Sequence, residues 1–595
     1  MRAFADFLVT FPPQLAMSAP SRVAGAKRSA SIRADSCEAR VETTCESLFH
    51  EISSGARRLW VVGELFRYRG ERGSTQECAT RFLSDVEGGI ERADELAGQF
   101  AITLYVVDSG AWSIWTDRCG TVHVYLCEGP DSRAIGTYSG AVHIASARRL
   151  DWPAITAFLT NGFFPPLETH YKDVSVLQPS RRYDFDARGR LIQNSEYWSW
   201  RHEPLLRRGF NETVEQFGDT LKTVSADHAS RGRLVLPLSG GLDSRTLAVT
   251  VPKGSDVRSY SYGYDSESVE LRISREVAKS TGLTFEAHIV PPYLFDRLDD
   301  VLQSVEGFQD VTQARQASVS HWLGEHADAV LGGHWGDVFC DDMGVPEDAG
   351  VPGDLAKHAL KKLAKRGNDW LIRNVCVPNL AGEKPEEVAS AAIRDELDRL
   401  RSSIADPDFR IKVMKTRQWA FRWTLASVHM YQAGAYPRMP FFDPRIVDFF
   451  CTVPTEMVRG RRIQVEFLKR FAPHVARITW QAFETNLYWY PYFNTLLLPK
   501  RALSSLVRRL SPPRTCTRNW ELQFLGDREW SHLTERLLDA TLTLHDYVAL
   551  AAIRQLLMRF KETPGPEDGY AVSMLLTLSA WLESFHKKQS VVCAS

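Results

Sequence analysis

Residues 234–248 read Leu-Val-Leu-Pro-Leu-Ser-Gly-Gly-Leu-Asp-Ser-Arg-Thr-Leu-Ala. Residues 234–238 are a short apolar run, which predicts a strand buried on both faces. The two glycines that follow let the backbone turn tightly, and Ser244 onward is typical of the first turn of a helix that Pro252 ends. This order predicts a phosphate site, because the N–H groups and the dipole of a helix N-terminus favour a bound anion.

The side chains of the turn agree with this interpretation. The hydroxyls of Ser239 and Ser244 can donate to phosphate oxygens, and the Asp243 carboxylate suits a Mg²⁺ ion that bridges phosphates. The Gly-Lys-Ser/Thr ending of a Walker P-loop is missing. An ordinary turn with incidental serines is the alternative, but six specified positions in this context favour the phosphate site. The predicted nucleotide-binding residues of the turn are Leu238, Ser239, Gly240, Gly241, Asp243 and Ser244.

The sequence Ser-Gly-Gly-Leu-Asp-Ser at residues 239–244 resembles the pyrophosphate loop of the ATP pyrophosphatases, which split ATP into AMP and pyrophosphate to activate a substrate. The resemblance implies ATP and Mg²⁺ as cofactors. Residues 257–263 and 284–290 predict two more strands, with a helix at 270–281 between them. Strands that alternate with helices predict a parallel, doubly wound sheet. ATP would lie across the carboxyl ends of its strands, with adenine near Ser261 and Tyr262.

Length and composition set the broad limits. A chain of 595 residues is too long for one core, so we expect two or more domains. The net charge of −1 offers no general attraction for nucleic acid or anionic membranes, and we expect neither as a partner. The ten cysteines are scattered without zinc-like spacing, which favours a reducing, cytoplasmic location. No apolar run reaches the roughly 18–20 residues of a membrane span.

Residues 1–35 carry more basic than acidic side chains. Asp6 and the Pro12-Pro13 pair interrupt any signal-peptide core. We interpret this segment as a flexible basic extension.

Residues 36–205 show short strands separated by turns. Residues 59–66 predict a strand and 79–95 a helix, and residues 100–107 and 112–115 predict a hairpin. In this order the segment resembles the N-terminal glutaminase-type domain of class B asparagine synthetases. The resemblance implies an N-terminal-nucleophile fold, in which two sheets are stacked between helix layers (αββα).

That family uses a cysteine directly after the initiator methionine as the glutaminase nucleophile. Here Arg2 follows Met1, and the first cysteine is Cys37. An N-terminal nucleophile uses its own free amine as the base, so Cys37 cannot replace it without cleavage. We therefore expect a degenerate domain that does not hydrolyse glutamine.

Residues 206–595 contain a second motif of the same family. Residues 329–331 predict a strand that runs into Gly-Gly-His-Trp-Gly-Asp at 332–337, which resembles the family's Ser-Gly-Glu-Gly-x-Asp. The resemblance aligns Gly333 with the nucleotide site and Asp337 with the second magnesium-binding carboxylate, opposite Asp243. Two carboxylates beside a triphosphate suit Mg²⁺. A solvated loop aspartate is the alternative.

A third motif is Arg-Met-Pro-Phe-Phe-Asp at residues 438–443, which resembles the family's Glu-x-Arg-x-Pro-Phe-Leu-Asp. The resemblance implies catalytic roles for Arg438 and for Tyr436, which stands where the family has the glutamate that orients the amine. A tyrosine with an ordinary pKa near 10 is a poor base, and Tyr436 can equally be a packing aromatic. The family lysine that follows this motif is unmatched; Arg477 is a candidate, although a surface role is the simpler interpretation. The tail from 501 to 585 is predicted to be helical.

These motifs together resemble the asparagine synthetase superfamily, which adenylates a carboxylate and lets an amine attack the acyl-AMP. tRNA-thiolating enzymes need reactive cysteines, and NAD and GMP synthetases lack the third motif. Without a glutaminase, the amine must come from solution or from the substrate itself. Intramolecular capture removes an entropic barrier worth several kcal/mol.

Our hypothesis is a lasso-peptide macrolactam synthetase that acts on a peptide, with a precursor-processing protease as a possible partner. Two alternatives remain within the superfamily: ammonia-dependent amidation of a small amino acid such as aspartate, and β-lactam closure. A third alternative is a nucleotide-binding scaffold without catalytic activity.

Overall fold

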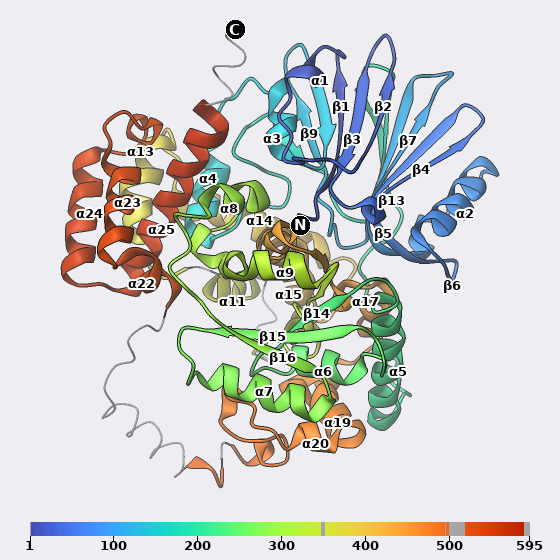
Figure 1. Cartoon of the computed structure of the whole chain (residues 1–595), viewed down its shortest axis with the longest axis vertical. Helices are drawn as coiled ribbons and strands as arrows, with labels where there is room; N and C mark the ends of the chain where they lie inside the picture. The colour runs from blue at the N-terminus through green and yellow to red at the C-terminus, as the bar shows by residue number, and fades with distance from the viewer. Residues whose placement is uncertain (1, 347–351, 364, 494, 499–517, 588–595) are drawn as a thin grey trace.

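The computed structural model describes residues 2–346, 352–363, 365–493, 495–498 and 518–587. Its named strands form two antiparallel sheets from residues before 197 and one parallel sheet from residues after 233. Figure 1 shows the antiparallel sheets in blue and cyan above the green parallel sheet, with the red C-terminal helices to one side. The chain therefore has the mixed α/β organisation that the sequence predicts.

Two antiparallel sheets make up the N-terminal part. The first has the order β11 (Val174–Val176), β9 (Tyr125–Glu128), β10 (Arg133–Gly136), β1 (Ala5–Phe11), β3 (Glu38–Thr43) and β2 (Arg28–Arg33). The second has the order β13 (Leu191–Glu196), β12 (Arg181–Phe185), β8 (Ala111–Thr116), β7 (Leu96–Val106), β5 (Arg57–Tyr68) and β4 (Phe49–Ser54), with β6 (Glu71–Arg72) paired to β5. The predicted hairpin is formed by β7 and β8.

The two sheets pack face to face. Phe7 and Val41 of the first sheet share one apolar cluster with Trp60 and Tyr105 of the second. Helix α2 (Thr75–Glu87) covers the outer face of the second sheet, and a capping box begins it at Ser74. Helix α3 (Ser139–Val142) and the residues after it pack on the first sheet. This order of layers agrees with the predicted sandwich.

The prediction of a flexible extension at residues 1–35 is wrong. Strand β1 lies inside the first sheet, between β3 and β10, and β2 forms its edge. Asp6, taken as a break in the apolar run, instead accepts hydrogen bonds from Arg22, at 2.8 and 2.9 Å. Arg22 is buried and also lies 3.4 Å from Glu306. A sheet partner distant in sequence therefore orders this segment, which no local pattern indicates.

The parallel sheet has the order β16 (Thr284–Ile289), β15 (Val257–Gly263), β14 (Leu234–Pro237), β17 (Ala329–Leu331) and β18 (Tyr436–Arg438). All four neighbouring pairs are parallel, as predicted. The central strand β14 is apolar and almost completely buried because helices cover both faces. Helices α5 (Phe210–His228), α6 (Asp243–Thr250), α7 (Val269–Thr281) and α9 (Ser320–His326) contact this sheet or one another.

Helices dominate the rest of the chain. They include α14 (Pro385–Leu400), α15 (Pro407–Lys415), the π-helix η7 (Thr416–Thr424), α16 (Leu425–His429), α17 (Pro444–Cys451) and α19 (Arg462–Phe471). The predicted helical tail begins outside the described residues, and its described part contains α22 (Asn519–Phe524), α23 (Asp527–Leu538), α24 (Leu550–Glu562) and α25 (Pro566–Trp581). Helix α25 is buried along most of its length, as the core of this bundle requires.

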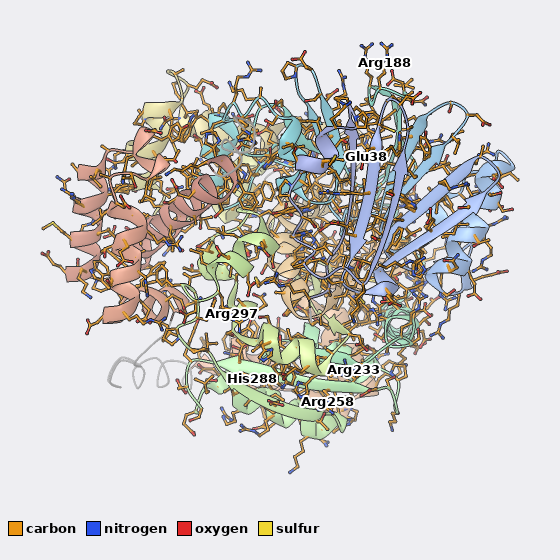
Figure 2. The ribbon with its side chains drawn as sticks, turned by 45° about the horizontal axis from the view of Figure 1, so that its top comes forward. Glu38, Arg188, Arg233, Arg258, His288 and Arg297 are labelled. Atoms are coloured by element: carbon orange, nitrogen blue, oxygen red, sulfur yellow. The ribbon has the colours of Figure 1, made fainter. Side chains whose placement is uncertain are left out.

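Charged side chains lie at both ends of the molecule. Figure 2 shows Glu38 and Arg188 over the antiparallel sheets, and Arg233 and Arg258 over the parallel sheet. Among the helices of the described residues, we find none that combines the length and the apolar character needed to cross a bilayer.

Candidate active site

The predicted phosphate loop joins β14 to α6. The hydroxyl oxygens of Ser239 and Ser244 are 3.0 Å apart, and the backbone N–H of Ser239 donates to the Ser244 hydroxyl at 3.1 Å. The N–H of Gly241 donates to the Ser239 hydroxyl at 3.3 Å. The loop is therefore held in a tight turn by its own hydroxyl groups, directly before the N-terminus of α6, where bound anions are favoured.

The loop after β17 lies against this turn. A Cβ atom on Gly333 would be 3.0 Å from the backbone nitrogen of Ser244, and one on Gly336 would be 2.7 Å from an oxygen of Asp243. Glycine at both positions is thus required by the close approach of two loops. This approach brings Asp337, one residue after Gly336, to the same side of the sheet as Asp243.

A cavity of about 460 Å³ opens between these loops, within the size range of small-molecule sites. Most of the predicted nucleotide and metal residues line it: Leu238, Ser239, Asp243, Ser244, Ser261, Gly333 and Asp337. Gly240 and Gly241 do not line it. A Cβ on Gly240 would meet the side chain of Gln481, and the backbone N–H of Gln481 donates to the Gly240 carbonyl at 3.1 Å. The structure therefore brings together residues that are nearly 100 positions apart in the chain.

The charge of Asp243 is only partly balanced. Burial raises its pKa and the nearby charge of Asp337 adds to the rise, whereas Arg461 and Gln464 oppose it. The Arg461 guanidinium donates to one carboxylate oxygen, and the Gln464 amide donates to the same oxygen at 3.1 Å. Arg461 itself has left-handed backbone angles (φ 61°) directly before α19. A protein cation thus already faces the first predicted magnesium ligand.

Asp243 and Asp337 fit a magnesium ion by their donor chemistry. Both offer oxygen, which Mg²⁺ prefers, and both line the same cavity. In the part of the chain that the structure describes, no group of three or more His, Cys, Asp or Glu side chains could hold a metal. Phosphate oxygens and water would therefore have to complete the shell, which is how Mg²⁺ binds together with a nucleotide.

A sequence model of the asparagine synthase family matches residues 219–583, more than half of the chain. This range contains both loops, Asp243 and Asp337. The chain belongs to the asparagine synthase family. It is accordingly an ATP-dependent ligase that forms carbon–nitrogen bonds.

Other comparisons add little to this family assignment. No curated protein sequence matches the chain. Among solved structures, an allosteric regulatory enzyme of purine biosynthesis has 9% identity and a TM-score of 0.24, covering 48% of this chain and 81% of its own. Glutamine phosphoribosylpyrophosphate amidotransferase from B. subtilis has 10% identity and a TM-score of 0.22, covering 48% of this chain and 65% of its own. These TM-scores are too low to support a conclusion.

More than half of the residues that line the cavity were not predicted as site residues. Most of these are aromatic or charged: Tyr260, Glu270, Arg315, His334, Trp335, Lys415, Trp419, Trp423 and Tyr431. Burial lowers the pKa of His334 to about 4, although Asp337 opposes the shift, so its imidazole is neutral at pH 7. One signal was present in the sequence, because Lys415, Trp419 and Trp423 recur at every fourth position and share a helix face.

The structure does not bring Arg438 of the asparagine synthase motif to the cavity. Its guanidinium donates to both carboxylate oxygens of Glu64 at 2.6 Å, and to the carbonyls of His228 and Arg231 at 2.7 Å. Glu64 belongs to β5, so this pair joins the sandwich to the parallel sheet. Each of the three guanidinium nitrogens of Arg438 donates to the protein, which favours a structural role over the predicted catalytic one.

Tyr436 lies on the same strand and is also directed away from the cavity. Its hydroxyl donates to the carbonyl of Gln99 at 3.4 Å, and burial raises its pKa far above the ordinary value. Tyr436 therefore stays protonated at neutral pH and cannot act as a base. Arg477, the substitute for the family lysine, is exposed and does not line the cavity either.

Four cysteines of the sandwich are buried: Cys37, Cys78, Cys119 and Cys127. Burial raises the pKa of each thiol. Since the thiolate is the reactive form, these cysteines are poor nucleophiles at neutral pH.

Proposed function

We propose that this member of the asparagine synthase family adenylates a carboxylate of a peptide and closes an intramolecular amide, as a lasso-peptide macrolactam synthetase does. The single observation that carries the proposal is that the Ser239–Ser244 turn, Asp243 and Asp337 line one cavity. Backbone N–H groups and hydroxyls of a pyrophosphatase-type loop would hold the departing pyrophosphate. A Mg²⁺ ion held by Asp243 and Asp337 would neutralise the triphosphate.

The aromatic lining favours a peptide over aspartate. Trp335, Trp419 and Trp423 contribute large flat surfaces to one cavity, and indole rings bind apolar and aromatic groups. Aspartate has little apolar surface to place there. A peptide that carries the acid would use this surface and would also bring its own amine.

The source of the amine supports ring closure. The buried sandwich cysteines are kept as thiols, so release of ammonia from glutamine by them is disfavoured. His334 is a weak base, and Tyr436 is protonated and outside the cavity. A peptide α-amine, with a pKa near 8, is partly neutral at physiological pH, whereas a lysine amine is not. An N-terminal amine held beside the acyl-AMP thus needs little base catalysis and gains from proximity.

The test combines the purified protein with ATP, Mg²⁺ and a linear core peptide. We expect AMP, pyrophosphate and a product lighter by one water. The same peptide with an acetylated N-terminus is the matched control: it keeps the carboxylate, so AMP formation continues through hydrolysis of the acyl-AMP, but no ring forms. Absence of both AMP and the lighter product with the free peptide would reject the proposal.

Two further results would point to the alternatives. Ammonia-stimulated AMP formation with aspartate favours amidation of a small amino acid. ATP binding without pyrophosphate release from any acid favours a nucleotide-binding scaffold. If the peptide is the substrate, its free N-terminus must be produced from a longer precursor, so we also propose a precursor-processing protease as partner; co-purification of the two proteins tests this.

A further inference from the structure

We propose that Lys415, Trp419 and Trp423 form the subsite for the acid substrate, and that they recognise a carboxylate beside an apolar or aromatic residue of a peptide. All three line the cavity. They recur at every fourth position from the end of α15 along η7, which keeps them on one helix face. Adenylation of the bound carboxylate rests on the proposed function, whereas binding of the carboxylate to this subsite is tested separately.

Lys415 supplies the charge of this subsite. The described contacts of its ammonium group are with rings: it lies 5.0 Å from the centroid of Trp419 and 5.8 Å from that of Trp335. Burial lowers the pKa of Lys415, while the charge of Asp337 opposes the shift. Lys415 is half-buried, and no carboxylate among the described residues forms an ion pair with it. An anionic ligand could replace the water that such an ammonium group loses on burial. A substrate carboxylate has the matching charge.

The two indoles supply the apolar surface. Trp419 and Trp423 meet edge to face with centroids 5.8 Å apart. Lys365, which is not part of the cavity lining, lies 5.3 and 5.4 Å from the two rings and helps to fix them. The indole N–H of Trp419 is buried with no acceptor among the described residues. A backbone carbonyl of a bound peptide would satisfy it.

The position of this wall suits a second substrate. Its cation and rings line the cavity that also holds the phosphate loop, Asp243 and Asp337. Trp335 connects the two parts, because it contacts Lys415 and stands two residues before Asp337. The nucleotide and the acid would therefore be bound by different chemistry within one cavity: the first by backbone N–H groups and a metal, the second by an ammonium group and indoles.

The test measures binding of two synthetic peptides with amidated C-termini, Gly-Ala-Phe-Asp-Ala-Ala and the same peptide with Asn for Asp. Quenching of tryptophan fluorescence reports binding, with Mg²⁺ and a non-hydrolysable ATP analogue present. We expect wild-type protein to prefer the Asp peptide by about tenfold, a difference of 1.4 kcal/mol. Lys415→Gln should lose this preference and Lys415→Arg should keep most of it. Lys365→Gln is the matched control, since it removes a cation from the same rings outside the cavity, and should keep the preference.

Trp419→Leu should weaken both peptides to the same degree, because it removes surface rather than charge. Equal wild-type affinity for the two peptides, or an undiminished preference in Lys415→Gln of unchanged melting temperature, would overturn the subsite. AMP formation is measured in parallel with ATP. Lys415-dependent binding without AMP supports the subsite and rejects the ligase proposal for this peptide class. AMP formation with the same KM for the peptide in Lys415→Gln and wild type supports the ligase proposal and rejects the subsite.

Discussion

Two arginine–carboxylate pairs, each with one motif residue, differ in their surroundings. Arg438 and Glu64 join the sandwich to the parallel sheet, with side chains 4% and 3% exposed. Arg461 and Asp243 meet at the cavity, with side chains 11% and 19% exposed. The pKa of Glu64 is lowered, since Arg438, with help from Arg231 and His228, outweighs the effect of burial. That of Asp243 is raised, because burial and Asp337 outweigh Arg461.

The pKa of Glu64 is lowered and that of Asp243 is raised, and this difference distinguishes a structural carboxylate from a functional one. In the Glu64–Arg438 pair every charge is met by the protein, so the pair stabilises the ionised fold. At the cavity, the two carboxylates of Asp243 and Asp337 share one nearby guanidinium, and a further cation would be favourable. Removing a side chain from the first pair should therefore affect stability, and removing one from the second should affect activity.

The largest expected effect is that of Asp243→Asn on activity. Loss of a carboxylate that positions the metal and phosphates should lower the rate of AMP formation by about a thousandfold. Stability should be unchanged or higher, because the raised pKa of Asp243 means that its ionised form is unfavourable in the folded protein. Asp256→Asn, at an exposed position directly before β15, is the control. A variant with normal turnover would remove Asp243 from the metal site.

Glu64→Gln should have the reverse pattern. It leaves the Arg438 charge buried without a counter-ion, at a cost of about 3–5 kcal/mol in the free energy of unfolding. Urea titration measures this cost, and Glu38→Gln, in the pair with the exposed Arg33, should cost less than about 1 kcal/mol. Turnover per folded molecule should stay close to wild type. A stable variant with a strongly reduced turnover would instead favour a catalytic role for Arg438.

The stability contributions of Glu64 and Asp243 should depend on pH in opposite directions. The folded pKa of Glu64 lies below its unfolded value of about 4.3, so its contribution is present above that pH and is lost as pH falls through the folded pKa. Glu64→Gln should therefore flatten the acid limb of a stability profile. Asp443 and Asp227, whose pKa values are also lowered, should maintain part of that limb. The pKa of Asp243 is raised, so protonation of Asp243 stabilises the folded protein as the pH falls. Asp243→Asn should therefore remove this gain in stability at acidic pH. Urea titrations from about pH 3 to 7 measure both effects.

Local sequence patterns predicted those parts of the site that depend on residues close together in the chain. The strand, turn and helix around Ser239 follow from short-range chemistry, as does an aspartate placed after the strand at 329–331. The partner of Arg438 could not be predicted from local patterns, because Glu64 lies 374 positions away in the chain. The same holds for strand β1, whose ladder partners define it. A motif thus identifies residues that matter to a family without showing whether they bind a ligand or connect two domains.

The smallest expected effect concerns Arg461. Its guanidinium faces Asp243 where a metal would also be attracted, so it should compete with Mg²⁺ before the nucleotide binds. Arg461→Gln should let Mg²⁺ alone stabilise the protein, by about 1.4 kcal/mol at ten times the dissociation constant, whereas wild type should respond little without ATP. Thermal melts with Mg²⁺ and without nucleotide measure the difference. Arg459→Gln, at an exposed position two residues earlier, is the matched control. An equal response of all three proteins would mean that Arg461 does not compete with Mg²⁺ at Asp243.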